Sequence, residues 1–319
     1  MTRLRAAAAS ALLAALLLLA AACAGTRSGT EGAAAAAGRP PSSAEVRLVV
    51  TRDWGRTAMR DVTVPLDDRM TVMRLLAENA EVDTGYGGRF VNGVDGVRST
   101  FDGAGSGSAA DWFYWVDGAL ADVGADDWKL AGGETVWWDY HQWQDAMYVP
   151  LTLSAFPRPF AGEPLPVAGH VARADYADWA TSSGLRLGPA IPIDEPPRGR
   201  ALVVATVNEA LAPQWLADIL EGRSETAGVF VRSRLGSIEA FAPGLDFGLP
   251  VHAAIFVVPN PRDAAQPLLL VLGDDRQAVT DLLARATPEA LSGHVGLAVT
   301  DEGRTVALPL APSDSPEGV

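Results

Sequence analysis

Between residues 44 and 157, short stretches alternate hydrophobic and polar side chains, which is the pattern of strands that bury one face. Residues 45–52 (EVRLVVTR) and 60–65 (RDVTVP) are predicted to be two such strands, joined by a turn. Residues 71–80 (TVMRLLAENA) place their hydrophobic side chains at helical spacing, which predicts a helix with Thr71 as its N-cap. The folded part of the chain is therefore expected to begin with two strands and a helix.

Three further strands are predicted after this helix. Residues 86–94 (YGGRFVNGV) are typical of a glycine-rich strand, and residues 111–116 (DWFYWV) and 135–141 (TVWWDYH) of two aromatic strands. Two strands, a helix and then more strands indicate a small mixed sheet over one helix. We therefore predict an α+β domain over residues 44–157.

The remainder of the chain predicts a second domain. Residues 158–200 are rich in proline and are predicted to be an ordered connector. Residues 201–312 alternate strand-like and helical runs, which indicates a small α/β or α+β domain. Residues 313–319 are expected to be a disordered tail. The expected strands of the second domain are 201–207, 228–232, 251–258, 268–272 and 294–300, and its expected helices are 213–221 and 275–286.

The N-terminus has the layout of a bacterial lipoprotein signal. Residues 1–22 carry Arg3 and Arg5 ahead of an uncharged, alanine-rich run, as a secretory signal peptide does. The run ends in LAAAC, which resembles a lipobox with Cys23 as the lipidated residue. The alternative is a plain secreted protein with an incidental cysteine. Because the sequence holds one cysteine and therefore no disulfide partner for it, we expect Cys23 to anchor the protein to the extracytoplasmic face of the cell membrane.

The composition of the chain predicts a disordered tether and argues against nucleic acid as a partner. Residues 23–43 are small or polar and are expected to form a disordered tether, since they cannot bury enough surface to offset the entropy of ordering. The formal charge of the chain is −14, and removing Arg3 and Arg5 with the signal gives −16 (−14 minus 2). A chain this acidic is not expected to bind nucleic acid, which needs clustered Lys and Arg.

The two aromatic strands carry aromatic side chains on both faces. Because side chains alternate along a strand, Phe113 and Trp115 share the outer face with Trp137 and His141. One aromatic face serves the core, so the other needs a second explanation. It either packs against the rest of the chain or forms a platform for a flat, partly apolar ligand or a sugar. Phe113, Trp115, Trp137 and His141 are the candidate ligand-binding residues.

The same two strands resemble a known family. WFYWVDG at residues 112–118 and GGETVWWDY at 132–140 resemble the paired signature of a bacterial family of unknown function that is related to the C-terminal domain of transcobalamin and intrinsic factor. The chain departs from that signature at Asp117, where asparagine is usual, and at Glu134, where aspartate is usual. The resemblance covers about residues 45–147. It implies a β-grasp-like domain and, since the vitamin carriers close this domain over cobalamin, a corrinoid as one ligand class.

The second half of the chain is similar to lipoproteins of high-GC bacteria that have the same two-part layout. The matching stretches are MYVPLTLSAFPRPF, ETAGVF and PLLLVLGDDRQAV. That resemblance implies export and the architecture, because the relatives have no assigned activity.

No catalytic motif accompanies these features. The four histidines are far apart in sequence and form no zinc-binding pair, and no nucleophile motif is present. We therefore expect a non-enzymatic, extracytoplasmic lipoprotein without a cofactor, whose first domain binds a small ligand. The alternative is an interaction or structural module of a cell-surface or transporter assembly, with no small-molecule ligand.

Overall fold

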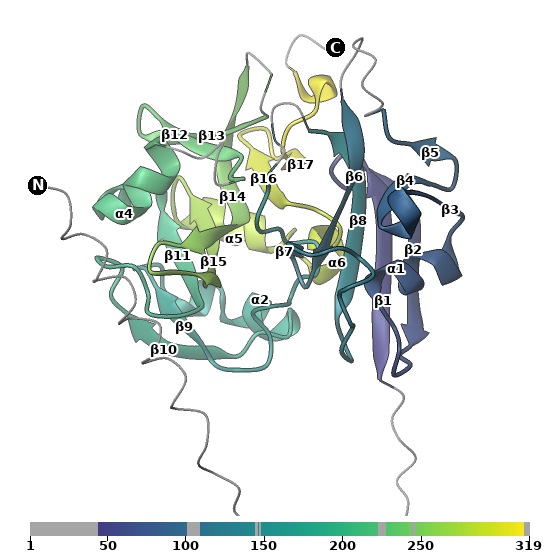
Figure 1. Ribbon diagram of the computed structural model, residues 1–319. Helices are drawn as coiled ribbons and strands as arrows, with labels where there is room; N and C mark the ends of the chain where they lie inside the picture. Colours follow the sequence, from purple (N-terminus) through teal and green to yellow (C-terminus); the bar gives the residue numbers. More distant parts are fainter. Residues whose placement is uncertain are drawn as a thin grey trace, which may run out of the picture. The chain divides into compact units, whose positions relative to one another are not determined.

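The computed structural model describes residues 44–100, 109–143, 146, 148–222, 228–242, 244 and 247–315 (Figure 1). The expected signal peptide, Cys23 and the tether, at residues 1–43, lie outside the described residues. Within the described part of the chain, no helix is both long and apolar enough to cross a membrane. Residues 43–319 cluster into one compact unit, which contains an N-terminal lobe (residues 44–149) and a C-terminal lobe (residues 150–315).

The N-terminal lobe is built on a five-stranded mixed sheet in the order β2-β1-β8-β6-β7. The central pair, β1 and β8, is parallel, whereas β1 with β2 and β6 with β8 are antiparallel. The two aromatic strands predicted from the sequence are β6 and β8, and they are neighbours. The strands are β1 (Glu45–Arg52), β2 (Thr57–Pro65), β6 (Ala110–Val116), β7 (Ala119–Leu120) and β8 (Thr135–Gln142).

Helix α1 (Val72–Asn79) covers one face of this sheet. Its N-cap is Thr71, as predicted, and the Thr71 hydroxyl accepts a hydrogen bond from the backbone N–H of Arg74 at 3.1 Å. Leu75 and Leu76 are fully buried against this face of the sheet. Burying a leucine side chain contributes roughly 1.5–3 kcal/mol, so these two contacts hold the helix in place.

A small antiparallel sheet follows α1, in the order β3-β4-β5. Residues 86–94, predicted as a single strand, instead begin with a 3-10 turn, Tyr86–Gly88, in which Gly87 has a φ of 74°. That left-handed conformation breaks the strand, because it turns the chain out of the extended geometry. The strands are β3 (Val82–Gly85), β4 (Phe90–Val94) and β5 (Val97–Arg98).

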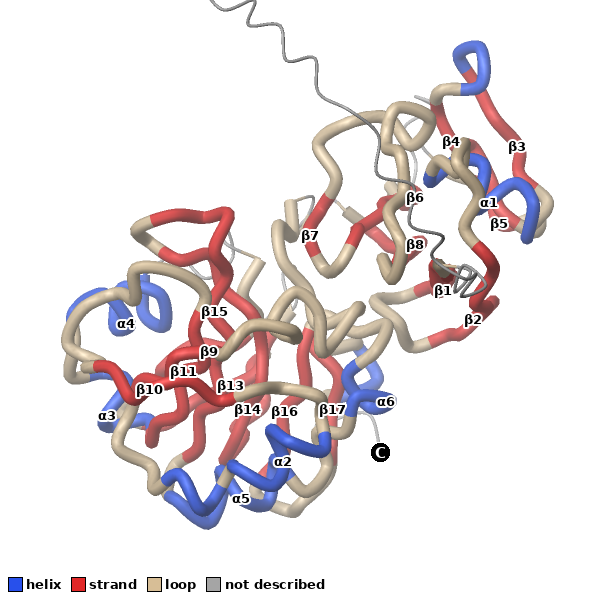
Figure 2. Tube along the Cα trace, turned by 90° about the horizontal axis from the view of Figure 1, so that it is seen from below, coloured by secondary structure: helices blue, strands red, loops and turns tan. Residues whose placement is uncertain are grey.

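The C-terminal lobe contains a nine-stranded mixed sheet. Seven strands run in the order β10-β9-β11-β15-β14-β13-β12, and β16 pairs with both β14 and β17 (Figures 1 and 2). The strands are β9 (Leu165–Ala168), β10 (Leu187–Ile191), β11 (Ala201–Thr206), β12 (Val231–Arg234), β13 (Ser237–Phe241), β14 (Gly248–Asn260), β15 (Asp263–Gly273), β16 (Gly296–Thr300) and β17 (Thr305–Leu308).

Helices cover both faces of this sheet, because β11 and β15 alternate buried side chains between the two faces. Leu202 packs with α2, α5 and α6, whereas its neighbour Val203 packs with α3 and α4. The helices are α2 (Ala177–Ser182), α3 (Val207–Leu211), α4 (Gln214–Ala217), α5 (Arg276–Leu283) and α6 (Pro288–Leu291). A π-helical turn, Asp218–Gly222, extends α4, and 3-10 turns lie at Arg173–Asp175 and Pro312–Asp314.

Two further expectations need correction. Residues 158–200, predicted as a connector, supply β9, β10 and α2, and β9 pairs in parallel with β11, so this segment belongs to the second sheet. The expected tail begins later than residue 313, because the Asp314 carboxylate accepts a hydrogen bond from the backbone N–H of Ala311 at 2.7 Å. The α+β class holds, since both lobes combine mixed sheets with helices.

Candidate functional site

The outer aromatic face of the first sheet is interior. Trp115 and Trp137 are 1% and 0% exposed, His141 is 2% exposed, and Phe113 is half-buried. They belong to one hydrophobic cluster that continues into the C-terminal lobe, where Phe230 lies with its ring centroid 6.0 Å from that of Trp54. Of the two explanations for this face, packing against the rest of the chain therefore describes these residues, and they do not form an open platform.

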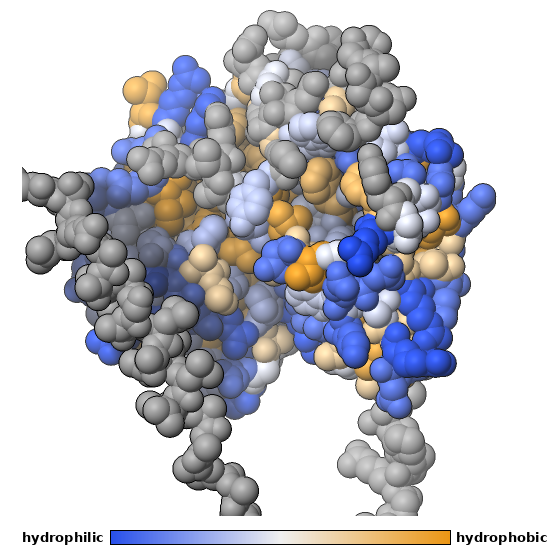
Figure 3. Space-filling model, in the orientation of Figure 1, coloured by the Kyte–Doolittle hydropathy of each residue, from blue (hydrophilic) through white to orange (hydrophobic). Residues whose placement is uncertain are grey.

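The surface agrees with this placement. Large hydrophobic side chains that remain exposed in the described part of the chain are Phe90, Val123, Tyr148 and Leu235. Figure 3 shows hydrophobic surface in separate patches among hydrophilic side chains. The exposed hydrophobic side chains do not include the four candidate ligand-binding residues.

His141 is held inside an aromatic stack. Its ring lies 3.6 Å from that of Trp54 and 4.7 Å from that of Phe113, centroid to centroid, and both pairs are stacked. Its Nδ1 lies 3.0 Å from Oδ2 of Asp139, which is fully buried. Because solvent barely reaches this imidazole, we interpret the histidine–aspartate pair as part of the core.

The Asp139 carboxylate organises the turn between β1 and β2. It accepts hydrogen bonds from the Thr51 hydroxyl at 2.5 Å and from the backbone N–H groups of Trp54 at 3.0 Å and Gly55 at 3.1 Å. Asp53 and Trp54 have φ angles of 56° and 61°, a left-handed conformation that costs a residue with a Cβ roughly 1–2 kcal/mol. Asp139 stabilises this turn, because its side chain supplies acceptors for two backbone N–H groups of the turn.

The turn joins the two lobes. A Cβ atom on Gly55 would lie 1.8 Å from the carbonyl oxygen of Gly293, so the two backbones are in direct contact there. The next residue, Arg56, donates to the backbone oxygens of Ala307, at 3.1 Å, and Pro309. These contacts fix the turn between β1 and β2 against the loop that precedes β16 and against the end of β17.

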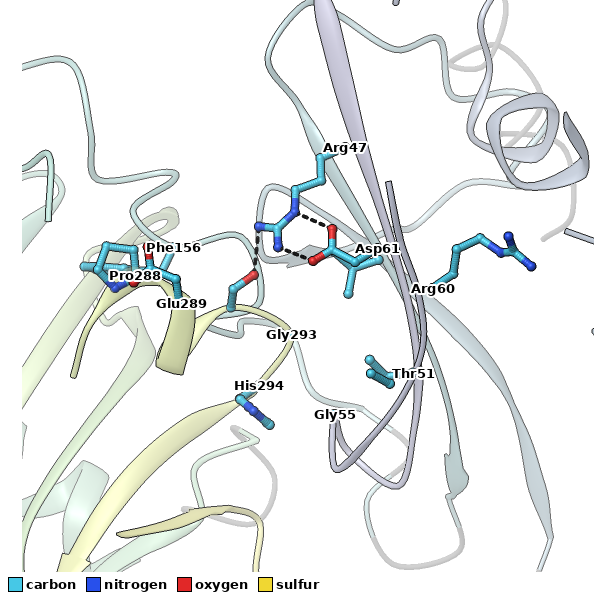
Figure 4. A pocket seen from close by; sticks show the side chains of 13 residues that line it. Arg47, Thr51, Gly55, Arg60, Asp61, Phe156, Pro288, Glu289, Gly293 and His294 are labelled. Carbon is cyan, nitrogen blue, oxygen red and sulfur yellow. Dashed lines mark hydrogen bonds and ion pairs between the residues drawn. The ribbon is translucent and has the colours of Figure 1, made fainter. Parts of the chain in front are cut away.

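A cleft of about 460 Å³ with a mixed polar and apolar lining lies beside this junction (Figure 4). One wall is the face of β1 and β2, and the other is α6 with the loop that leads to β16. Figure 4 shows the Arg60 side chain turned away from the cleft, and its guanidinium pairs with Asp95 at 2.9 Å. The lining residues are Arg47, Val49, Thr51, Gly55, Ala58, Arg60, Asp61, Phe156, Pro288, Glu289, Ser292, Gly293 and His294.

Arg47 connects the two walls of the cleft. Its Nε and Nη2 donate to the two carboxylate oxygens of Asp61, at 2.8 and 2.6 Å, and its Nη1 donates to the Ser292 hydroxyl at 2.9 Å. The hydrogen bond from Arg47 lowers the pKa of Asp61, and the same bond raises the pKa of Arg47. Both groups are therefore charged at neutral pH, and their bidentate pairing holds the Arg47 fork in one orientation.

Two more groups set the chemistry of the cleft. Burial lowers the pKa of His294, whose Nδ1 lies 3.4 Å from the Trp54 carbonyl oxygen, so the ring is neutral at neutral pH. Hydrogen bonding to its own backbone N–H and to the Thr287 side chain lowers the pKa of Glu289. The cleft thus offers one guanidinium, the carboxylates of Asp61 and Glu289, and a neutral imidazole. This set can bind a polar or dipolar molecule.

Sequence patterns did not indicate this cleft. Arg47 is a polar position on an alternating strand, and its partner Ser292 is 245 residues away. His294 belongs to no histidine motif in the sequence, and in the described part of the chain no group of three or more His, Cys, Asp or Glu side chains could hold a metal ion. No local motif relates residues that only the packing of two lobes brings together.

Comparison with known families gives a match within the N-terminal lobe. Residues 70–142 match the model of a family described as "Domain of unknown function (DUF4430)". A crystal structure from Ruminococcus gnavus, described as a "putative metal binding protein", is 17% identical, covers 31% of this chain and 96% of its own, and superposes with a TM-score of 0.24. No curated protein matches the chain.

Proposed function

We propose that this protein is a non-enzymatic binding protein that holds a small polar molecule in the cleft between β1–β2 and the α6–β16 loop. The observation that carries the proposal is the pair of contacts that fix the two walls, namely the Arg47–Ser292 hydrogen bond and the close approach of Gly55 to Gly293. They leave a hollow of about 460 Å³, within the range of about 300–1,000 Å³ that small-molecule sites occupy, and such sites prefer domain interfaces.

The chemistry of the lining favours a molecule with hydrogen-bond donors and acceptors over a corrinoid. A corrinoid ring is broad and flat, and it needs an aromatic or apolar surface of similar extent. The aromatic side chains that would have supplied one, Trp115 and Trp137, are buried in the core. The carboxylates of Asp61 and Glu289 instead suit a partner that carries N–H or O–H groups.

We also infer a β-grasp-like arrangement for the N-terminal lobe. A hairpin of β1 and β2 precedes α1, and the last long strand, β8, lies parallel to β1 in the centre of the sheet. The helix packs across one face of that sheet. This order of elements supports the relation to the transcobalamin-like domain that the sequence resemblance implies.

We propose further that the protein acts at the extracytoplasmic face of the cell membrane, anchored by a lipid on Cys23. The support is the lipobox-like sequence and the short polar stretch after it. A Cys23→Ala variant should move from the membrane fraction to the soluble fraction after cell lysis, with the unchanged chain as control. A variant that stays with the membrane would contradict the anchor.

The ligand test uses full-length protein extracted from membranes in detergent. Native mass spectrometry and small-molecule extraction should detect a co-purifying polar compound. Ala58 is exposed on β2 and lines the cleft, so Ala58→Trp should fill the hollow and remove the compound. Thr57 is the exposed neighbour outside the lining, so Thr57→Trp should retain it. A compound that survives Ala58→Trp, or no compound in any preparation, would count against the proposal.

The second candidate function is an interaction or structural module of a surface or transporter assembly. It is favoured by the burial of Trp115 and Trp137, because these aromatic residues then serve the fold and no ligand is required to explain them. Cross-linking on intact cells, followed by mass spectrometry, should identify a partner transporter or surface protein if this function holds. The absence of any cross-linked partner, together with a bound compound, would favour the cleft.

A further inference from the structure

Strand β2 is an edge strand whose outer side is open. Among the described residues it pairs with β1 alone, and Figures 1 and 2 both show it at the outer margin of its sheet. The opposite edge of that sheet is covered, because the backbone N–H of Leu120 on β7 donates to the Pro150 carbonyl at 3.0 Å. An open edge strand offers its outward N–H and C=O groups to another strand.

The outward groups of β2 belong to Asp61 and Thr63, which are both exposed. The N–H of Leu66, directly after β2, donates inward to the Ala44 carbonyl at 2.6 Å. Because inward and outward residues alternate in an antiparallel pair, Thr63 and Asp61 direct their N–H and C=O groups away from β1. Arg47, opposite Thr63, accordingly donates its N–H to the other side of β1. Within the described ranges, none of the outward groups of Asp61 and Thr63 has a hydrogen-bond partner.

The open part of this edge is short, because both of its ends are blunted. On one side, the register with β1 shifts at a β-bulge that leaves Met59 as the extra residue. On the other side, Pro65 has no N–H to donate. Bulges and prolines are devices that limit pairing at an edge. Residues 61–64 (DVTV) remain open between them, and three of these four side chains are β-branched, as strand residues often are.

This open segment is complementary to itself. In an antiparallel pairing of two copies about a twofold axis at Val62, Asp61 of each copy lies opposite Thr63 of the other. Each such pair exchanges both of its N–H···O bonds, so every outward group of Asp61 and Thr63 is satisfied. An axis at Asp61 would oppose two carboxylates, and an axis at Thr63 would place Asp61 opposite Pro65, which cannot donate. The axis at Val62 is therefore the favoured register.

The side chains agree with this register. The two Val62 side chains lie opposite each other on the face that carries α1, where each is half-buried, so their contact covers apolar surface. On the other face, the Thr63 hydroxyl of one copy can donate to the Asp61 carboxylate of the other. Arg47 holds each Asp61 carboxylate through two hydrogen bonds, so the axis does not bring uncompensated like charges together.

We infer that β2 pairs with the β2 strand of a second copy of this chain, so that their two five-stranded sheets form one continuous sheet about a twofold axis at Val62. Twofold, self-complementary interfaces are the commonest kind in soluble homo-oligomers. Thr63 of the second copy then lies beside Asp61, which lines the cleft described above. The pairing uses backbone groups of β2 and does not depend on what the cleft binds.

Disulfide trapping of the full-length protein in detergent tests this interface. Val62→Cys places a thiol on the axis, where facing Cα atoms lie about 4.5 Å apart, within the range of about 4.4–6.8 Å that a disulfide spans. Mild oxidation should therefore link two copies. Val64→Cys is the matched control, because Val64 lies on the same face but opposite Arg60 of the second copy, too far from its own counterpart to bridge. The unchanged chain controls for linkage through Cys23.

A proline substitution tests the backbone pairing itself. Thr63→Pro removes one outward N–H from each copy, and no group in the described part of the chain uses that N–H. Added to Val62→Cys, it should reduce the linked fraction roughly tenfold or more, because two hydrogen bonds are lost across the axis. The unfolding midpoint should change little, which separates loss of pairing from loss of folding.

Three results would overturn the inference. They are no linkage of Val62→Cys, equal linkage of Val62→Cys and Val64→Cys, and linkage that Thr63→Pro leaves unchanged. Hydrogen exchange identifies a different occupant, since the amides of Asp61 and Thr63 should exchange faster as the protein is diluted. Slow exchange at every concentration would mean that another segment of the chain, or a different protein, covers β2, and would also contradict the second copy.

Discussion

Gly55 and Gly293 meet backbone to backbone, at a separation that leaves no room for a side chain on Gly55. A Cβ there would lie 1.8 Å from the Gly293 carbonyl oxygen and 2.7 Å from Nδ1 of His294. The φ of Gly55 is +85°, so the position also favours glycine through its backbone conformation. Two segments more than two hundred residues apart in the sequence thus fix the junction of the lobes.

Gly55→Ala should lower the free energy of unfolding by at least about 3 kcal/mol, because it adds a steric clash to the left-handed strain. Gly96→Ala is the matched control, since Gly96 has a φ of +81° but nothing within 4 Å of its added Cβ. That substitution should cost only about 1–2 kcal/mol. Urea unfolding followed by Trp fluorescence measures the free energy of unfolding of both variants. Equal losses would show that the two lobes can move apart at this contact at little cost.

Asp139→Asn should destabilise the protein by about 2–4 kcal/mol, because it replaces one acceptor oxygen in a buried group that accepts three hydrogen bonds, at 2.5, 3.0 and 3.1 Å. Asp61→Asn is the comparison, since its pairing with Arg47 is partly exposed and worth about 1 kcal/mol or less. Thermal and urea unfolding report the two losses. If Asp139→Asn is no more harmful than Asp61→Asn, the buried carboxylate does not organise the turn.

The stability of the protein should fall as the pH is lowered from about 7.5 to about 5.5, in part through His294. Burial lowers the pKa of His294, an effect that Arg56 reinforces and that the Trp54 carbonyl and Asp139 oppose. The neutral ring is favoured in the folded state, and the unfolded chain takes up the proton first. The neutral ring therefore contributes its full stabilisation at a pH above the pKa of His294 in the unfolded chain. This stabilisation is lost as the pH falls toward the lower pKa of His294 in the folded protein.

His294→Gln should reduce this pH dependence. Burial raises the pKa of Asp111, which has the opposite sign, because the folded state then binds the proton more readily and stability is lost as the pH rises above its ordinary value. That contribution is common to both proteins and cancels in the comparison. Unfolding free energies measured across the pH range should show a shallower slope for the variant, and identical slopes would remove His294 as the cause.

Arg56→Met should destabilise the protein by about 1–3 kcal/mol and speed amide exchange in β17, because the guanidinium holds the backbone oxygens of Ala307 and Pro309. Arg304→Met is the control, since Arg56 and Arg304 both pair with Asp314, at 3.4 and 3.3 Å, but the Arg304 side chain is 47% exposed against 23% for Arg56. Hydrogen exchange with mass spectrometry should show faster exchange at β17 for Arg56→Met alone. Equal protection in the two variants would contradict the role of Arg56.

Local pattern was enough to predict much of the N-terminal lobe. The helical spacing after Thr71 and the alternation in the two aromatic strands each depend on a few adjacent residues, and α1, β6 and β8 appear where those patterns indicate. In the C-terminal lobe, the helix predicted from residue 275 is α5, and its N-cap Asp275 accepts from the backbone N–H of Ala278 at 2.9 Å. Patterns of this kind depend only on residues within one helix or strand, so tertiary packing does not change the prediction.

The sequence could not predict which segments of the chain pack against each other. β9 is four residues long and lies in a proline-rich stretch, and its pairing with β11 decides that it is a strand. The outer aromatic face could be either a packing surface or a ligand platform, because aromatic side chains alternate along the strand in the same way in both cases. The cleft itself depends on the packing of β1 against the α6–β16 loop, which no short-range rule encodes.

The shared core has a consequence for the engineering of this protein. Trp115 and Trp137 belong to a hydrophobic cluster that is completed by side chains from beyond residue 149. A gene segment encoding residues 44–149 alone would expose an indole-rich face to water, and its product would self-associate instead of remaining a monomer. In this protein, residues 70–142 therefore depend on the companion lobe to cover their aromatic face, so an engineered N-terminal lobe must keep that lobe or have its outer face redesigned.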